Sequence, residues 1–134
     1  MTDSATASRF GEKVCVVTGA GGGIGSAIAR RLAREGATVV VCDVDGASAD
    51  KVVAEITASG GTAEAARFDL ADPSACAQAV DDVVARHGHL DVLVNNAGVN
   101  RRGDLLALSP KDWETSFAVN GPWARSLRRR TWPR

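Results

Sequence analysis

The sequence of 134 residues has no tyrosine, and it lacks the features of a membrane or secreted protein. No apolar run approaches the roughly 18 residues that cross a bilayer. Residues 1–13 are too polar for a signal peptide. With 45% hydrophobic and 24% charged residues, the composition is typical of a soluble globular domain. We therefore expect a disordered lead-in over residues 1–12, no membrane contact and a cytoplasmic location.

Cysteine and histidine are also scarce. Cys15, Cys42 and Cys76 are widely spaced inside apolar stretches, with no CxxC spacing that would indicate zinc or redox chemistry. We interpret them as reduced, packed thiols. His87 and His89 form an H-x-H pair without a third ligand, so we expect a surface pair and no metal site.

The net charge is zero, which gives no general attraction to nucleic acid or membrane. The charge is unevenly distributed, however. Residues 121–134 contain five arginines and no acidic residue, so residues 1–120 carry a net charge of −5. This asymmetry separates a basic tail at 121–134 from an acidic domain at 13–120.

Within residues 13–120, short apolar runs alternate with longer helical patterns. This alternation predicts right-handed βαβ units and a parallel sheet, because consecutive parallel strands need a crossover helix. The predicted fold class is α/β, a Rossmann-type doubly wound parallel sheet with about four strands and the pattern of five helices. Strands are expected at 13–19, 38–43, 62–69 and 90–98, and the last helix is expected to open at Ser109 and Pro110.

The first predicted strand leads into the glycine-rich segment "TGAGGGIGSAIA", residues 18–29. Glycines permit a tight turn and let the backbone approach a pyrophosphate, whose charge is met by amides at the following helix N-terminus. A glycine turn can also be purely structural. The order strand, loop, helix favours a dinucleotide-binding loop.

Asp43 ends the second predicted strand, 18 residues after Gly25. A carboxylate there can accept hydrogen bonds from the adenosine ribose hydroxyls and would repel a 2′-phosphate. The two flanking positions, Gly22 and Val44, carry no positive charge that would offset this repulsion, so the sequence favours NAD over NADP. The alternative is a strand-end residue that caps the next turn, a role for which Asp45 is an equal candidate.

Two motifs connect these residues to a family. The spacing T-G-x(3)-G-x-G occurs from Thr18 to Gly25, and "NNAG" follows the fourth predicted strand at 95–98. With both motifs in order, the chain resembles the N-terminal half of the short-chain dehydrogenase/reductases over about residues 10–120. The resemblance implies a Rossmann-type fold and a nicotinamide dinucleotide cofactor.

The resemblance also assigns roles to single residues. It implies that Gly19, Gly23, Ile24 and Gly25 form the pyrophosphate turn and that Asp43 is the ribose ligand. It also implies that Asp69 and Leu70 contact the adenine, and that Asn95, Ala97 and Gly98 form a segment beneath the ribose. Structural alternatives stay open: Asp69 could cap a turn, and Asn95 and Asn96 could satisfy strand-end backbone groups.

Asn120 resembles the helix asparagine of the family's catalytic group, where its backbone holds a water in a proton relay. The same position could simply be an exposed residue or a helix-end cap. The family's proton donor is a tyrosine followed by a lysine four residues later. This sequence has no tyrosine, and none of its lysines, Lys13, Lys51 and Lys111, follows Asn120. We therefore expect the cofactor-binding half of an NAD-dependent alcohol or carbonyl oxidoreductase, inactive alone and of unknown substrate.

A second hypothesis is a non-enzymatic nucleotide-binding or interaction module whose arginine-rich tail contacts nucleic acid or an acidic partner. We expect instead that residues 121–134 replace the catalytic half, which makes nucleic acid an unlikely partner. In the doubly wound order the fourth strand would have one edge unpaired, so self-association is also expected.

Overall fold

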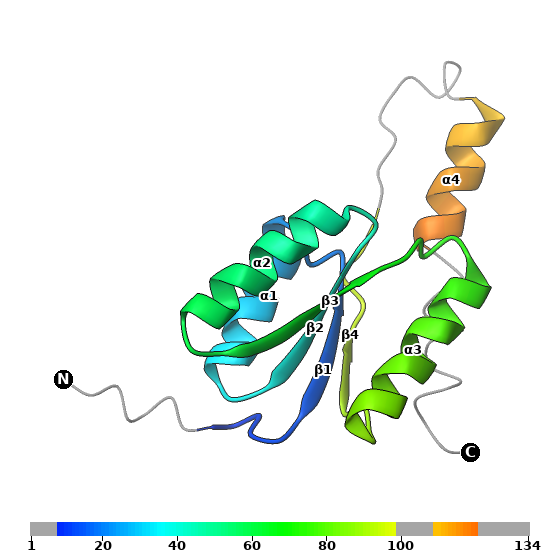
Figure 1. Ribbon diagram of the computed structural model, residues 1–134. Helices are drawn as coiled ribbons and strands as arrows, with labels where there is room; N and C mark the ends of the chain where they lie inside the picture. Colours follow the sequence, from blue (N-terminus) through cyan, green and yellow to red (C-terminus); the bar gives the residue numbers. More distant parts are fainter. Residues whose placement is uncertain (1–7, 99–108, 121–134) are drawn as a thin grey trace.

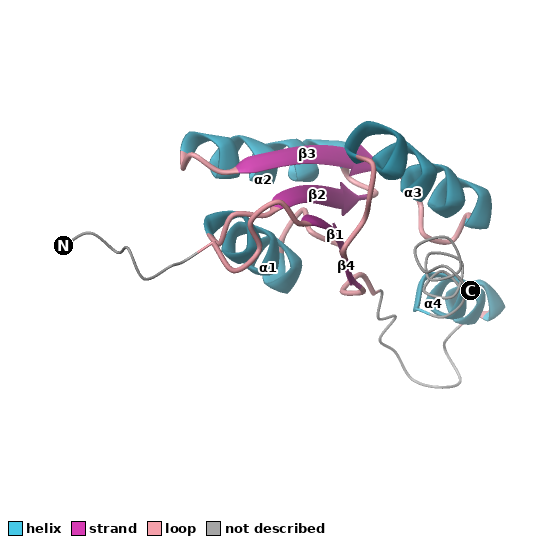
Figure 2. Cartoon of the chain, turned by 90° about the horizontal axis from the view of Figure 1, so that it is seen from below, coloured by secondary structure: helices cyan, strands magenta, loops and turns pink. Residues whose placement is uncertain are grey.

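The computed structural model describes residues 8–98 and 109–120, and these form a four-stranded parallel sheet flanked by helices (Figure 1). The strand order is β3-β2-β1-β4, as Figure 2 shows. This confirms the predicted Rossmann-type α/β fold, with four helices rather than five in the described residues. The elements are β1 Val14–Thr18, α1 Gly23–Arg34, β2 Thr38–Asp43, α2 Gly46–Ala58, β3 Thr62–Arg67, α3 Pro73–His87, β4 Val92–Val94 and α4 Pro110–Asn120.

The two central strands are buried on both faces. Alternate residues such as Cys15 and Val17 of β1 pack toward α1 and α2, while Val14 and Val16 pack toward α3. Because each face is covered by a helical layer, the strands are almost continuously apolar instead of alternating with polar residues. The helices α1 and α2 lie to one side of the sheet in Figure 1 and α3 to the other.

Three of the four helices begin with a side-chain cap. Asp45 accepts N–H hydrogen bonds at the start of α2, and Asp72 does so for α3. At α4, Ser109 and Asp112 hydrogen-bond reciprocally, as the sequence predicts. The exception is α1, whose N-cap is Gly22 and whose first turn contains no acidic residue.

Strand β4 lies at the edge of the sheet and, among the described residues, pairs only with β1. The self-association expected from this edge stays a prediction. Within the described ranges, every helix is too short or too polar to span a membrane. The basic tail at 121–134 and residues 1–7 of the expected lead-in lie outside the described residues.

Residues 8–12, which the sequence places in a disordered lead-in, form a turn that packs against the domain. Phe10 contacts the core between the sheet and the helices α1 and α2. The Glu35 side chain, only 1% exposed, forms ion pairs with Arg9 and Arg31. The ordered domain therefore begins before the first strand, because a buried carboxylate at the end of α1 needs the arginine of this turn.

The Glu35 pairs should make stability depend on pH. Hydrogen bonds from Arg9 and Arg31 lower the pKa of Glu35 from 4.5 to about 2. Because the folded pKa lies below the unfolded one, this stabilisation is present above pH 4.5 and is lost as pH falls toward 2. We expect Glu35→Gln to lower the thermal midpoint by roughly 5 °C at pH 7, and by progressively less below pH 4.5.

Circular dichroism melts between pH 2.5 and 7 would measure this difference. The matched control is Glu55→Gln, which removes the exposed ion pair between Glu55 and Arg30. That variant should change the midpoint little, because exposed pairs contribute little net stability. Equal losses in the two variants at pH 7 would contradict the role assigned to Glu35.

Candidate functional site

A pocket of about 390 Å³ opens where the strands end. Its walls come from the loops after all four strands and from Val119 near the end of α4. After β1 the chain continues to β2 on one side, whereas β4 pairs with β1 on the other side. The pocket thus lies at the topological switch point, where doubly wound proteins bind their ligands.

Six of the ten residues predicted to contact a cofactor line this pocket: Gly19, Asp43, Asp69, Leu70, Ala97 and Gly98. The other four do not line it: Gly23, Ile24, Gly25 and Asn95. The first three form the start of α1, beside the pocket residue Gly22. Ile24 is 74% exposed there, although the helical pattern of the sequence continues through it.

The glycine loop is packed directly against the segment that follows β4. Gly19 has a φ of +62°, and a Cβ atom on it would lie 2.8 Å from the Cα of Ala97. A Cβ on Gly25 would lie 2.3 Å from the carbonyl oxygen of Gly19. Only glycine fits at these two positions, because the contacts are with backbone atoms that cannot rotate away.

Thr18 and Asn96 fix this arrangement with hydrogen bonds. The Thr18 hydroxyl accepts the N–H groups of Asn96 and Ala97, both at 3.1 Å, and donates to the carbonyl of Val94 at 3.3 Å. The Asn96 side chain donates to the carbonyls of Thr18 at 3.1 Å and Gly19 at 3.3 Å. The ends of β1 and β4 are therefore held together by side chains where the ladder stops.

The sequence named Asn95 as the site residue, but Asn96 lines the pocket and Asn95 is exposed. Asn96 takes the role that had been left open for both, satisfying strand-end backbone groups. Strand periodicity contains the signal for it. Asn96 follows Val92 and Val94 at period two, and these two valines pack toward α1 and α2.

Asp43 is held at the end of β2 with its carboxylate in a fixed orientation. Its Oδ2 accepts the N–H of Gly21 at 2.9 Å, and its Oδ1 accepts the N–H of Asp45 at 3.0 Å. The helix-capping role belongs to Asp45, which accepts the N–H groups of Ala47 and Ser48. Asp43 supports the turn before α2 through the Asp45 N–H, as the structural alternative proposed, and it also lines the pocket wall.

Arg67 on β3 is the register partner of Asp43. Its side chain extends over Gly46, where a Cβ would lie 3.1 Å from the Arg67 Cδ. The pKa of Asp45 is lowered mainly by hydrogen bonds from Ser48, with a smaller contribution from Arg67. This cation thus lies toward the start of α2 and is absent from the pocket lining.

Asp69 and Leu70 line the pocket next to Phe68. Asp69 also accepts the Ala71 N–H at 2.9 Å, so it supports the turn before α3 as the structural alternative proposed. Leu70 packs on the buried face of α3. Cys42 adds a neutral thiol to this wall, because burial raises its pKa to about 12.

Asn120 lies at the end of α4, close to the segment after β4. Its Oδ1 is 3.1 Å from the place where a Cβ on Gly98 would be. The structure therefore brings Asn120 next to Gly98, although Val119 and not Asn120 lines the pocket.

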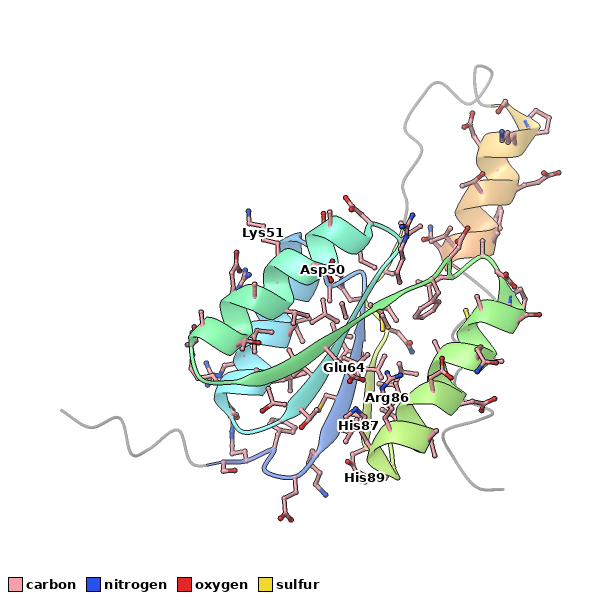
Figure 3. The ribbon with its side chains drawn as sticks, in the orientation of Figure 1. Asp50, Lys51, Glu64, Arg86, His87 and His89 are labelled. Carbon is pink, nitrogen blue, oxygen red and sulfur yellow. The ribbon has the colours of Figure 1, made fainter. Side chains whose placement is uncertain are left out.

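The histidines lie near the end of the sheet where β1 and β4 begin, as Figure 3 shows, whereas the pocket lies where the strands end. His87 contacts Glu64 with an Nε2 to Oε1 distance of 3.0 Å, next to the Arg86 ion pair. His89 contacts Asp91 at 3.1 Å. No group of three metal-ligating side chains occurs in the ranges 8–98 and 109–120. All three cysteines are free and buried, as expected of packed thiols.

The parallel sheet, the glycine loop and the switch-point pocket define a Rossmann-type nucleotide-binding architecture. Residues 13–122 match the family model of the short chain dehydrogenases, and the chain belongs to this family.

Similar proteins include a short chain dehydrogenase/reductase of Aspergillus novofumigatus, which is 44% identical over 90% of this chain and 46% of its own length. The meso-2,3-butanediol dehydrogenase of Serratia marcescens is 44% identical over 84% of this chain and 44% of its own length. A crystal structure of a metagenomic short-chain oxidoreductase in complex with NADP superposes with a TM-score of 0.87 at 43% identity, over 91% of this chain and 56% of that one. The chain thus spans about half the length of the curated relatives it matches.

Proposed function

We propose that residues 13–120 bind a nicotinamide dinucleotide in the switch-point pocket and that NAD is preferred over NADP. The observation that carries this proposal is the carboxylate of Asp43, fixed by two backbone N–H groups at the pocket wall. The family membership and the NADP complex of the metagenomic relative support the cofactor class. The preference for NAD rests on Asp43 alone.

The pyrophosphate would lie against the glycine loop and the start of α1. Gly19 and Gly25 let the backbone come close, and Gly23 begins the helix with a φ of +56°. Because no side chain caps α1 and its first turn has no acidic residue, the positive end of the helix dipole remains available to an anion. The exposed Ile24 adds an apolar cover beside this loop.

The adenosine would occupy the part of the pocket between the ends of β2 and β3. Asp43, which lines the pocket, would accept hydrogen bonds from both ribose hydroxyls, while Asp69 and Leu70 would border the adenine together with the apolar side chain of Phe68. Asn95, Ala97 and Gly98 would pass beneath the ribose as the continuation of β4. A 2′-phosphate would meet the charge of Asp43, and Arg67 is directed toward Asp45 instead.

The reaction we propose for the whole protein is hydride transfer between an alcohol or carbonyl substrate and the nicotinamide, which supplies the hydride donor or acceptor when bound. Asn120 is the proposed catalytic residue in this chain, positioning a water in a proton relay. Hydride transfer also needs an acid or base at the substrate oxygen, and this chain has no tyrosine that could serve as that group. We therefore expect the 134-residue chain to bind dinucleotide without turnover. Oxidation of a panel of secondary alcohols by this chain would contradict that expectation.

Fluorescence titration with NADH and NADPH tests the cofactor proposal. We expect wild-type chain to bind NADH more tightly, and Asp43→Asn to weaken NADH binding by about tenfold while NADPH binding stays equal or improves. The matched control is Asp50→Asn, which makes the same charge change at an exposed position on α2 (Figure 3). Tighter binding of NADPH by the wild-type chain would overturn the NAD preference.

A further inference from the structure

Gly21 is the loop residue that contacts the carboxylate of Asp43, yet its own backbone does not require glycine. The glycines with positive φ among the described residues are Gly19, Gly23, Gly36, Gly60 and Gly88. Since Gly21 is not one of them, an alanine could adopt its conformation. A different reason must account for the small residue at this position in the fold.

That reason is the space above Gly21. A Cβ there would lie 2.7 Å from Oδ2 of Asp43 and 2.8 Å from the Cβ of Ser48. Both distances are shorter than any ordinary contact, so both contacts would have to be relieved.

Of the two neighbours, Asp43 is the one that can yield. Ser48 belongs to the first turn of α2, and its hydroxyl donates to Asp45 at 2.8 Å while its N–H donates to the same residue at 3.3 Å. Its Cβ is therefore fixed to the helix backbone. The Asp43 carboxylate is the end of a side chain and can rotate about χ1 and χ2. A side chain at Gly21 would thus displace the carboxylate, and relief of the contact with the Ser48 Cβ would require a small shift of the loop backbone in addition.

We propose that Gly21 is a specificity-determining residue that positions Asp43 and thereby sets the preference for the 2′-hydroxyl over the 2′-phosphate form of the dinucleotide. This inference rests on the function proposed above. Gly21 acts in two ways: its N–H holds Oδ2 at 2.9 Å, and its missing Cβ leaves the volume that the carboxylate occupies. Displacing Asp43 would remove its hydrogen bonds to the ribose and also move its charge away from a 2′-phosphate.

The test measures dissociation constants for NADH and NADPH with the 134-residue chain and its variants. We expect Gly21→Ala to lower the preference for NADH over NADPH by about tenfold, the size of one charged hydrogen bond. The control is Ser48→Gly, which changes neither Gly21 nor Asp43 and lies outside the pocket lining. Its preference should remain within about twofold of wild type, because Asp43 is not displaced.

A double-mutant cycle separates positioning from a general effect on the loop. If Gly21 acts through Asp43, then Gly21→Ala should not change the preference further in a chain that already contains Asp43→Asn. Should Gly21→Ala fail to fold, the pair Gly21→Ala and Ser48→Gly takes its place, because it removes the Ser48 contact and keeps the one with Asp43.

A folded Gly21→Ala chain with the wild-type preference would overturn the inference while leaving the proposed function intact. An equal further loss of preference in the Asp43→Asn background would overturn it too, since Gly21 would then act independently of Asp43. If the wild-type chain bound neither nucleotide, the proposed function itself would fail and the inference with it.

Discussion

Replacing Gly25 with alanine is expected to abolish dinucleotide binding, with an affinity loss of at least about a hundredfold. Alanine is the better helix former by about 1 kcal/mol, so propensity alone would favour the change. The added methyl, however, would lie 2.3 Å from the carbonyl oxygen of Gly19 and 2.5 Å from Nδ2 of Asn96. Relief requires the loop backbone to move, which costs about 1–3 kcal/mol and separates α1 from the loop that would hold the pyrophosphate.

Nucleotide titration together with thermal unfolding would test this expectation. Gly22→Ala serves as the comparison for stability alone, because its Cβ would be unobstructed by protein atoms. It should lower the unfolding free energy by less than about 1 kcal/mol, from the weaker N-cap preference of alanine. Wild-type NADH affinity in Gly25→Ala would show that the close contact between the loop and α1 does not matter for binding.

Much of the sheet could be predicted because its strands have strong local signals. The run of valines in β2 is read correctly to the residue, Thr38–Asp43, since buried parallel strands are nearly continuous apolar runs. The edge strands are shorter than predicted. Strand β4 covers only Val92–Val94 of the expected 90–98, because the ladder with β1 ends there and side chains of Thr18 and Asn96 take over.

The parts that could not be predicted depend on contacts between distant segments. The turn at residues 8–12 has no periodicity, and its order depends on Glu35, which is 26 residues from Arg9. The motif alone contains both Asn95 and Asn96, and the period-two pattern of Val92 and Val94 is what indicates that Asn96 turns toward β1. The role of Gly21 depends on Asp43 and Ser48, which only the fold brings together. Local pattern predicts elements, whereas these pairings follow from tertiary packing.

Thr18→Val is expected to destabilise the domain by about 1–3 kcal/mol and to weaken nucleotide binding severely. Valine has nearly the same shape, so packing at this fully buried position is preserved. What is lost is the hydroxyl that accepts two N–H groups, those of Asn96 and Ala97, at 3.1 Å each. The Asn96 N–H keeps its hydrogen bond to the carbonyl of Val94 at 3.1 Å, so the Ala97 N–H is the donor that loses its partner, which costs about 1–3 kcal/mol.

Thr18→Ser provides the matched comparison, because it keeps the hydroxyl and removes only a methyl group, which costs about 1 kcal/mol. Denaturant unfolding and NADH titration of the two variants separate hydrogen bonding from packing. If the hydroxyl joins the ends of β1 and β4, serine should retain most of the affinity, since Asn96 would still hold the carbonyl of Gly19 in place. Equal stability of the valine and serine variants would mean that packing, rather than this hydrogen-bond network, positions the glycine loop at the pocket.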